Sequence, residues 1–302
     1  MKRNDFKVSL VEYDNLSWNM YVMVFRSVIK KPILRNLGPA FNEVVSEHEK
    51  CTRTSAGPVL FLLAHPDDEI LVRPLIVRSL KANGAIVVYL TKGNGNDAQI
   101  RPLEALKALE DIGVPKQAVF FIGHELDILD GKAISNLQPL FDRLTDQAFL
   151  PSIGSLVTHA FEGGHPDHDA AHIIGLKLAH FFSISQVSFA IPFYRRSKSG
   201  FPPYIVQYPP PDVPGFQRIH LDFDEAITIV LAIRHHPSQI KTFIGLGPWL
   251  IMRAIFDRTL YVQKLSESVA PNRPMDEPLL IEKRYNVLFQ NIAKEAHSFL
   301  ER

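Results

Sequence analysis

The chain has 302 residues, of which 46% are hydrophobic and 22% are charged, so its composition is that of an ordinary globular protein. Basic residues exceed acidic ones by only one (33 − 32), which excludes a strong overall attraction to nucleic acid or anionic lipid. A single cysteine, Cys51, excludes an intramolecular disulfide framework and every cysteine-based zinc module. Any bound metal must therefore be held by carboxylates and by some of the 12 histidines.

The first 57 residues lack the features of a secretory signal, because the apolar run from Met20 to Phe25 is too short and no cleavage site follows it. We favour a helix packed on the core over an amphipathic basic helix that rests on a membrane. The apolar run 243–256 is interrupted by Arg253 and falls short of the ~20 residues that cross a bilayer. Since one cysteine is typical of a reducing compartment, we expect a cytoplasmic protein.

From Pro58 onward, apolar runs typical of strands alternate with segments typical of helices. The predicted strands are 59–64, 85–91, 118–122, 156–159 and 187–193, and the predicted helices are 69–82, 101–112, 134–147 and 169–182. This alternation predicts an α/β fold, a Rossmann-like and mostly parallel sheet with helices on both faces.

The remaining segments are predicted from their composition. Six prolines within 201–216 predict an irregular loop, and the segments 224–265 and 282–300 are predicted to be helical. We therefore expect an N-terminal extension over residues 1–57 and an α/β domain over 58–240. A helical C-terminal region over 241–302 would pack on the same domain.

Polar segments follow three of the predicted strands, at residues 64–69, 91–97 and 159–169. Ligands of open parallel sheets bind at this edge, where the carboxyl ends of the strands meet. In the first segment, the neighbouring carboxylates of Asp67 and Asp68 both stay ionised when a cation or strong donors lie between them. The alternative is that these acids stabilise the positive end of the following helix without a metal.

The third segment favours the metal interpretation. His165 and His168 lie three residues apart, and imidazole is a common ligand of zinc, which in catalytic sites keeps three protein ligands and a position for water. One histidine and one aspartate from the first segment, with one histidine from the third, would supply these ligands. Capping of the next helix by Asp167 or Asp169 is the alternative for this segment, but two such segments at one sheet edge favour a metal site.

The string AHPDDE at residues 64–69, followed about a hundred residues later by HPDH at 165–168, resembles the LmbE-like (PIG-L) family of zinc-dependent N-acetylglucosaminyl deacetylases. Weaker matches lie at 90–93, 101–114, 130–131 and 238–239, so the resemblance covers about residues 58–239. It implies that His65, Asp68 and His168 bind one zinc ion per chain, with Fe2+ as an alternative metal in vivo.

The resemblance also implies catalytic roles. Asp67 matches the general base that takes a proton from the zinc-bound water, and His165 matches the residue that stabilises the oxyanion or protonates the leaving amine. Asp167 matches the carboxylate that tunes this histidine, while Arg101 and Asp130 match positions that contact the substrate. The implied activity is hydrolysis of the N-acetyl group of an N-acetylglucosamine-type sugar or glycoconjugate, with no nucleic-acid partner.

Chemistry supports this activity, because zinc lowers the pKa of bound water to ~7 and polarises a carbonyl, so no serine or cysteine nucleophile is needed. The segment Glu162-Gly163-Gly164 lacks an aromatic residue that some family members place there. We therefore expect an aromatic ring from elsewhere in the chain, or a simpler oxyanion site.

Alternatives concern the reaction and the substrate. The pattern Gly93-x-Gly95-x-x-Ala98 is one form of the dinucleotide fingerprint, which would indicate a nucleotide-binding Rossmann-type oxidoreductase. A deacylase of another N-acyl amine would keep the mechanism and change the substrate. The segment His235-His236-Pro237-Ser238-Gln239 either lines the pocket or is a helix break before Pro237, and the sequence leaves both open.

Overall fold

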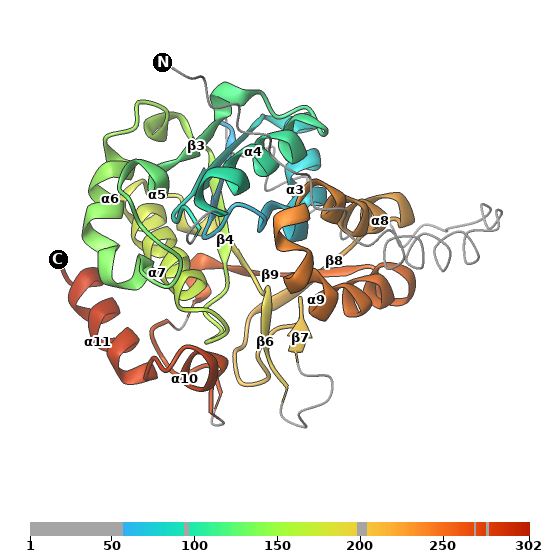
Figure 1. Ribbon diagram of the computed structural model, residues 1–302. Coiled ribbons are helices and arrows are strands. Elements are labelled where there is room, and N and C mark those ends of the chain that lie inside the picture. The colour runs from blue at the N-terminus through green and yellow to red at the C-terminus, as the bar shows by residue number, and fades with distance from the viewer. Residues whose placement is uncertain (1–56, 94–96, 198–203, 269, 276–277) are drawn as a thin grey trace, which may run out of the picture. The chain divides into compact units, whose positions relative to one another are not determined.

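The computed structural model describes residues 57–302 except 94–96, 198–203, 269 and 276–277 (Figure 1). The N-terminal extension expected over residues 1–57, with its helix, therefore lies outside the described residues except for Gly57. The single cysteine, Cys51, also lies outside the described residues, and so does Gly95, which belongs to the dinucleotide-type pattern. The described residues all belong to one compact unit.

A seven-stranded sheet forms the centre of this unit, in the strand order β3-β2-β1-β4-β5-β9-β8. The parallel strands are β1 (Val59–Leu63), β2 (Ala85–Tyr89), β3 (Val119–Phe121), β4 (Ser155–His159) and β5 (Phe189–Ile191). Two antiparallel strands extend the sheet, β9 (Thr259–Lys264) beside β5 and β8 (Phe216–His220) beside β9. The predicted α/β fold with a mostly parallel sheet is thus confirmed.

Helices cover both faces of the sheet. Successive side chains of β1 point to opposite faces, and every residue of β1 is buried, so both faces are covered. Leu60 and Leu62 join one apolar core, whereas Phe61 and Leu63 join the other. The first core includes residues of α5 (Ile122–Glu125), α6 (Leu137–Thr145), α7 (Pro166–Phe181) and α11 (Phe289–Leu300). The second includes residues of α3 (Glu69–Ala82), α4 (Asp97–Glu110), α8 (Phe223–Ala232) and α9 (Ile240–Met252).

Two predictions about the second half of the chain are wrong. The helix predicted over 224–265 gives way after α9 to the strand β9, which is rich in β-branched and aromatic residues and lies between two partner strands. The loop predicted over 201–216 contains the strand β7 (Tyr204–Val206), which pairs with β6 (Tyr194–Arg196), and it ends where β8 begins. The C-terminal region contains α9, α10 (Leu280–Arg284) and α11, and β9 interrupts these helices.

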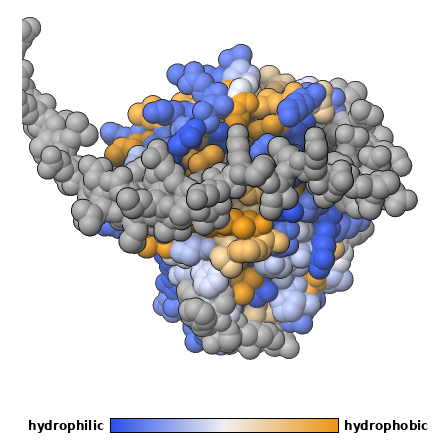
Figure 2. Space-filling model, turned by 90° about the vertical axis from the view of Figure 1, so that its right-hand side faces the viewer, coloured by the Kyte–Doolittle hydropathy of each residue, from blue (hydrophilic) through white to orange (hydrophobic). Residues whose placement is uncertain are grey.

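Helix α9 is apolar on its inner and its outer side. Phe243, Leu246 and Leu250 are buried in the core, while Ile244 and Met252 are exposed on the surface. Figure 2 views the side on which α8 and α9 lie, where apolar residues reach the surface between the atoms drawn in grey. None of the helices in the described ranges has the length and apolarity that a membrane crossing requires.

Gly123 allows α5 to approach the end of β2 closely. A Cβ atom at this position would lie 2.3 Å from the carbonyl oxygen of Leu90. We expect Gly123→Ala to lower the free energy of unfolding by about 1–3 kcal/mol, because the backbone must shift to admit the methyl group. Urea unfolding would measure this loss. Gly245→Ala is the control, since nothing lies within 4 Å of the place that its methyl group would take, and equal stability of both variants would contradict the close approach.

Candidate active site

The pairing of β1 with β4 brings the two polar segments together. Leu60 of β1 is opposite Leu156 of β4 in a parallel register, so both strands end at the same edge of the sheet. His65 and Asp68 follow β1, and His168 lies in the first turn of α7, after β4. One nitrogen or oxygen atom from each of these three side chains lies within 4.8 Å of the others. The predicted metal ligands therefore converge, and all three are buried.

His168 has the properties of a metal ligand. Its ring is fully buried, and neither Nδ1 nor Nε2 has a hydrogen-bond partner among the described residues. Nε2 lies 3.5 Å from Oδ1 of Asp68. Burial lowers the pKa of His168 to about 3, although the Asp68 carboxylate opposes the shift, so the ring is neutral. A neutral, buried imidazole of this kind fits a metal ion, which would supply the missing partner.

His159, which belongs to neither of the two motifs in the sequence, lies directly against the ligand group. Its ring stacks on His168 with 4.1 Å between centroids, and its Nε2 lies 3.2 Å from Oδ2 of Asp68. The same nitrogen accepts a hydrogen bond from the backbone N–H of Ala64 at 3.0 Å. The signal available in the sequence was its position, since His159 is the last residue of a strand that ends at the site edge.

His65, His165 and Asp167 form a second group that could hold a metal, and it shares His65 with the first. Oδ2 of Asp167 lies 3.1 Å from Nε2 of His65 but 3.8 Å from Nδ1 of His165. Nδ1 of His165 instead accepts the backbone N–H of Asp167 at 3.1 Å. The structure thus places Asp167 closer to His65 than to His165, and its predicted role toward His165 stays a prediction.

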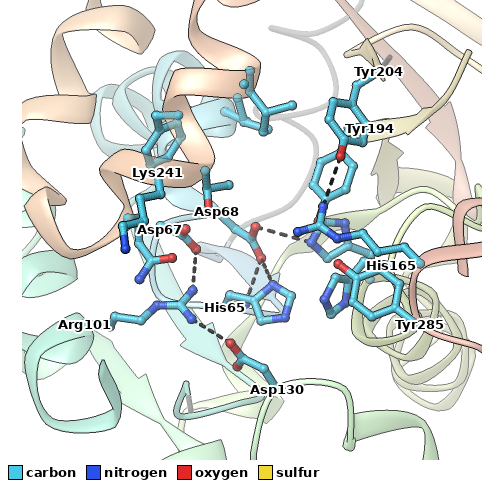
Figure 3. Close-up of a pocket in the computed structure, with 18 residues that line it drawn as sticks. His65, Asp67, Asp68, Arg101, Asp130, His165, Tyr194, Tyr204, Lys241 and Tyr285 are labelled. Carbon is cyan, nitrogen blue, oxygen red and sulfur yellow. Dashed lines mark hydrogen bonds and ion pairs between the residues drawn. The ribbon is translucent and has the colours of Figure 1, made fainter. Parts of the chain in front are cut away.

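Arg101 joins two carboxylates at the floor of the site (Figure 3). Its Nη2 donates to Asp67 at 2.8 Å and its Nη1 donates to Asp130 at 2.7 Å. Burial raises the pKa of Asp67 to about 6, although Arg101 opposes this shift. A buried cation with two bound carboxylates fixes the side chains that it contacts. Arg101 and Asp130, predicted to bind substrate, therefore also hold Asp67 in place.

A cavity of about 240 Å³ opens above these side chains. All the predicted site residues except Asp167 line this cavity, and so does Leu71 of α3. The other lining residues come from the second half of the chain: Tyr194, Tyr204, Gln239, Lys241, Thr242, Phe243, Gly245, Leu246, Arg284 and Tyr285. Sequence reasoning missed these residues apart from Gln239, because they belong to no recognised motif.

Two tyrosines supply the aromatic surface that residues 162–164 lack. The Tyr285 ring contacts His165 edge-on at 4.5 Å between centroids, and the Tyr194 ring lies 5.1 Å from His168 in the same manner. Near α9, a helix break precedes Pro237, and Gln239 beyond it lines the cavity. His236 is buried with its Nε2 2.6 Å from Glu69 and is not among the lining residues.

Comparisons with known proteins agree with this geometry. Residues 60–179 match the profile of the family described as PIG-L: GlcNAc-PI de-N-acetylase. The chain therefore carries a PIG-L (LmbE-like) de-N-acetylase domain in this segment, which contains every predicted site residue. No curated protein matches the sequence significantly.

Solved structures of deacetylases are similar at low sequence identity, and the first of the two below shares the fold. A deacetylase of the teicoplanin biosynthesis pathway, in complex with bog, is similar with a TM-score of 0.51 and 14% identity over 68% of this chain and 95% of that chain. N,N'-diacetylchitobiose deacetylase from Pyrococcus horikoshii has a TM-score of 0.44 and 16% identity over 79% of this chain and 98% of that chain.

The loop between β4 and α7 is held by a buried carboxyl group. Oε1 of Glu162 accepts the backbone N–H groups of Phe193 at 2.7 Å and Tyr194 at 3.0 Å, while Oε2 has no hydrogen-bond partner among the described residues. Burial raises the pKa of Glu162 to about 8. The folded protein therefore keeps a proton on this group at neutral pH.

This proton makes stability depend on pH. In the unfolded chain Glu162 loses its proton near its ordinary pKa of ~4.3, so the folded state binds more protons between that pH and the folded-state value. The contribution of Glu162 to stability therefore falls as pH rises through this window, by at most ~1.4 kcal/mol per pH unit. Glu162→Gln should flatten the fall, as urea unfolding in mildly acidic and mildly alkaline buffer would show. An unchanged slope would contradict it, and Glu295→Gln, at an exposed position, is the matched control.

Proposed function

We propose that this protein is a metal-dependent amide hydrolase that removes the N-acetyl group from an N-acetylglucosamine-type sugar or glycoconjugate. The observation that carries the proposal is the buried group of His65, Asp68 and His168 beside Asp67, at the floor of a cavity within the PIG-L domain. The family description, GlcNAc-PI de-N-acetylase, supports an amino-sugar substrate, and the teicoplanin-pathway protein of similar fold is itself a deacetylase.

Zinc is the metal that we propose for His65, Asp68 and His168, because two imidazoles and a carboxylate suit a catalytic zinc site. The same donors also suit Fe2+, the alternative metal in vivo. When bound, such an ion lowers the pKa of a water ligand and polarises the carbonyl of the amide.

Asp67 is the proposed general base. Its carboxylate lines the cavity next to the ligand Asp68, and Arg101 holds Oδ1 at 2.8 Å. From this position Asp67 accepts a proton from the attacking water when the carbon–oxygen bond forms. Arg101 restricts the orientation of the carboxylate and compensates its negative charge in the buried site.

His165 is proposed to stabilise the oxyanion and to protonate the departing amine. It lines the cavity beside His168, and Tyr285 packs against its ring. Asp167 is proposed to tune His165; it accepts the backbone N–H groups of Gly131 and Ala133 and lies 3.8 Å from Nδ1 of His165. Arg101 and Asp130 both line the cavity, and we propose that their side chains contact sugar hydroxyls.

The metal ligands can be tested separately from the reaction. We expect purified protein to contain about one zinc ion per chain and His168→Ala to lose most of it, since three protein ligands are the minimum of a catalytic site. Metal content after dialysis, measured by mass spectrometry, checks this. His180→Ala lies exposed on the same helix and should keep the metal. Full metal retention in His168→Ala would refute the ligand assignment.

The general base can be tested with the metal in place. We expect Asp67→Asn to bind metal as the native protein does, yet to lower the rate of acetate release roughly 10²–10⁴-fold, the usual contribution of general acid–base catalysis. A panel of N-acetyl sugars, glycolipids and simple N-acyl amines would identify the substrate class. Asp146→Asn, at an exposed position directly after α6, should retain full activity. A fully active Asp67→Asn would exclude the proposed mechanism.

A further inference from the structure

The outer face of α9 is apolar from Ile244 onward. From the cavity end toward the π-helical turn after α9, this face presents Ile244, Gly245, Pro248, Met252 and Phe256. The exposed fractions are 55% for Ile244, 51% for Met252 and 73% for Phe256. Helix α9 contains no acidic residue. A helix that is apolar on all sides normally has a second apolar environment besides its own core.

A second cavity of about 250 Å³ extends this surface between α9 and β7. Ile205, Trp249, Met252 and Phe256 contribute to its lining, and Tyr204 lines both this cavity and the active-site cavity. The charged groups in the lining compensate each other, because Nη1 of Arg253 lies 2.8 Å from Oδ2 of Asp257. Tyr208 donates to the same carboxylate at 2.6 Å. The apolar surface is thus continuous with the mouth of the active site and carries no net charge of its own.

The mouth of the active-site cavity is cationic. Lys241 at the start of α9 and Arg284 at the end of α10 both line the cavity and are exposed. The acids that line the same cavity lie at its floor, where Arg101 pairs with Asp67 and Asp130 and the rings of His159 and His168 lie against Asp68. An apolar surface bordered by cations is complementary to a bilayer surface with anionic headgroups.

We propose that the α9 face, defined as Ile244, Gly245, Pro248, Met252 and Phe256, docks on a lipid bilayer that carries anionic headgroups. Helix α9 has 13 residues and is too short to cross the bilayer, so it would lie in the interface with Phe256 and Met252 inserted. Lys241 and Arg284 would face the headgroups, and the active-site cavity would open at the membrane surface. This surface does not depend on the reaction proposed above.

A second copy of the chain is a less favourable occupant of the same face. In an antiparallel twofold contact centred on α9, Lys241 of one copy would face the Met252 end of the other helix, and α9 has no acidic residue to compensate its charge. The headgroups of an anionic bilayer instead provide the charge opposite to that of Lys241 and Arg284.

Vesicle co-sedimentation of the full-length protein tests the docking. We expect binding to phosphatidylcholine vesicles that contain phosphatidylserine, weaker binding to phosphatidylcholine alone, and weaker binding at high salt. Phe256→Glu and Met252→Glu should each reduce the affinity roughly tenfold or more, because each removes a large apolar group from the interface and adds a charge. Lys241→Glu should weaken binding only to the anionic vesicles.

Phe181→Glu is the matched control, because Phe181 is 64% exposed at the end of α7, away from α9. It should leave vesicle binding unchanged, and the melting temperature of each variant shows that it is folded. Three results would overturn the docking: no vesicle binding by the native chain, equal binding by the native chain and the α9 variants, or a dimer in sedimentation analysis that Phe256→Glu dissociates while vesicle binding is absent.

Discussion

The parallel pairing of β1 with β4 is the constraint on which the site depends. The two strands are about a hundred residues apart in the chain, yet their register places the segments after Leu63 and after His159 at one edge. Both strands are buried over their whole length, and apolar cores on either side of the sheet hold them in this register. A shift of either strand by one residue would exchange its side chains between the two cores and separate the histidines from Asp68.

Buried charge is the second constraint, and the site compensates it locally. Arg101 satisfies Asp67 and Asp130, and backbone N–H groups satisfy Asp167. Among the described residues of the ligand group, the nitrogens of His168 are left without a hydrogen-bond partner. Since buried polar atoms are rarely left unpartnered, these nitrogens suit a cation that accepts nitrogen and oxygen ligands. The surrounding network keeps these ligands close together before any ion arrives.

The sequence predicted the parallel half of the sheet well, because β1, β2 and β4 are short apolar runs followed by polar segments. Because strand ends of a parallel sheet share an edge, it also predicted that a histidine and an aspartate after β1 would meet a histidine after β4. The resemblance to the family then implied that these are His65, Asp68 and His168. It did not predict β9, because this strand has only six residues and only Asp257 and Arg258 separate it from the apolar segment that ends at Phe256.

Tyr194, Arg284 and Tyr285 could not be found from the sequence for another reason. They reach the cavity through tertiary packing of β6 and α10, and a lone tyrosine or arginine carries no pattern. His159 could be predicted only in part, since the sequence shows its position at the end of β4 but not its stacking on His168. The domain boundary expected near residue 240 stays a prediction, although β9 from beyond that boundary pairs with β5 in the central sheet.

The floor of the cavity and the wall that α9 and α10 contribute to it come from different parts of the chain. The floor comes from segments next to β1 and β4, whereas Lys241, Arg284 and Tyr285 come from beyond the segment that matches the family. Substitutions in the wall can therefore accumulate over evolution without disturbing the ligand atoms below. Such a division lets related chains keep one reaction centre while they diverge in what they admit to it.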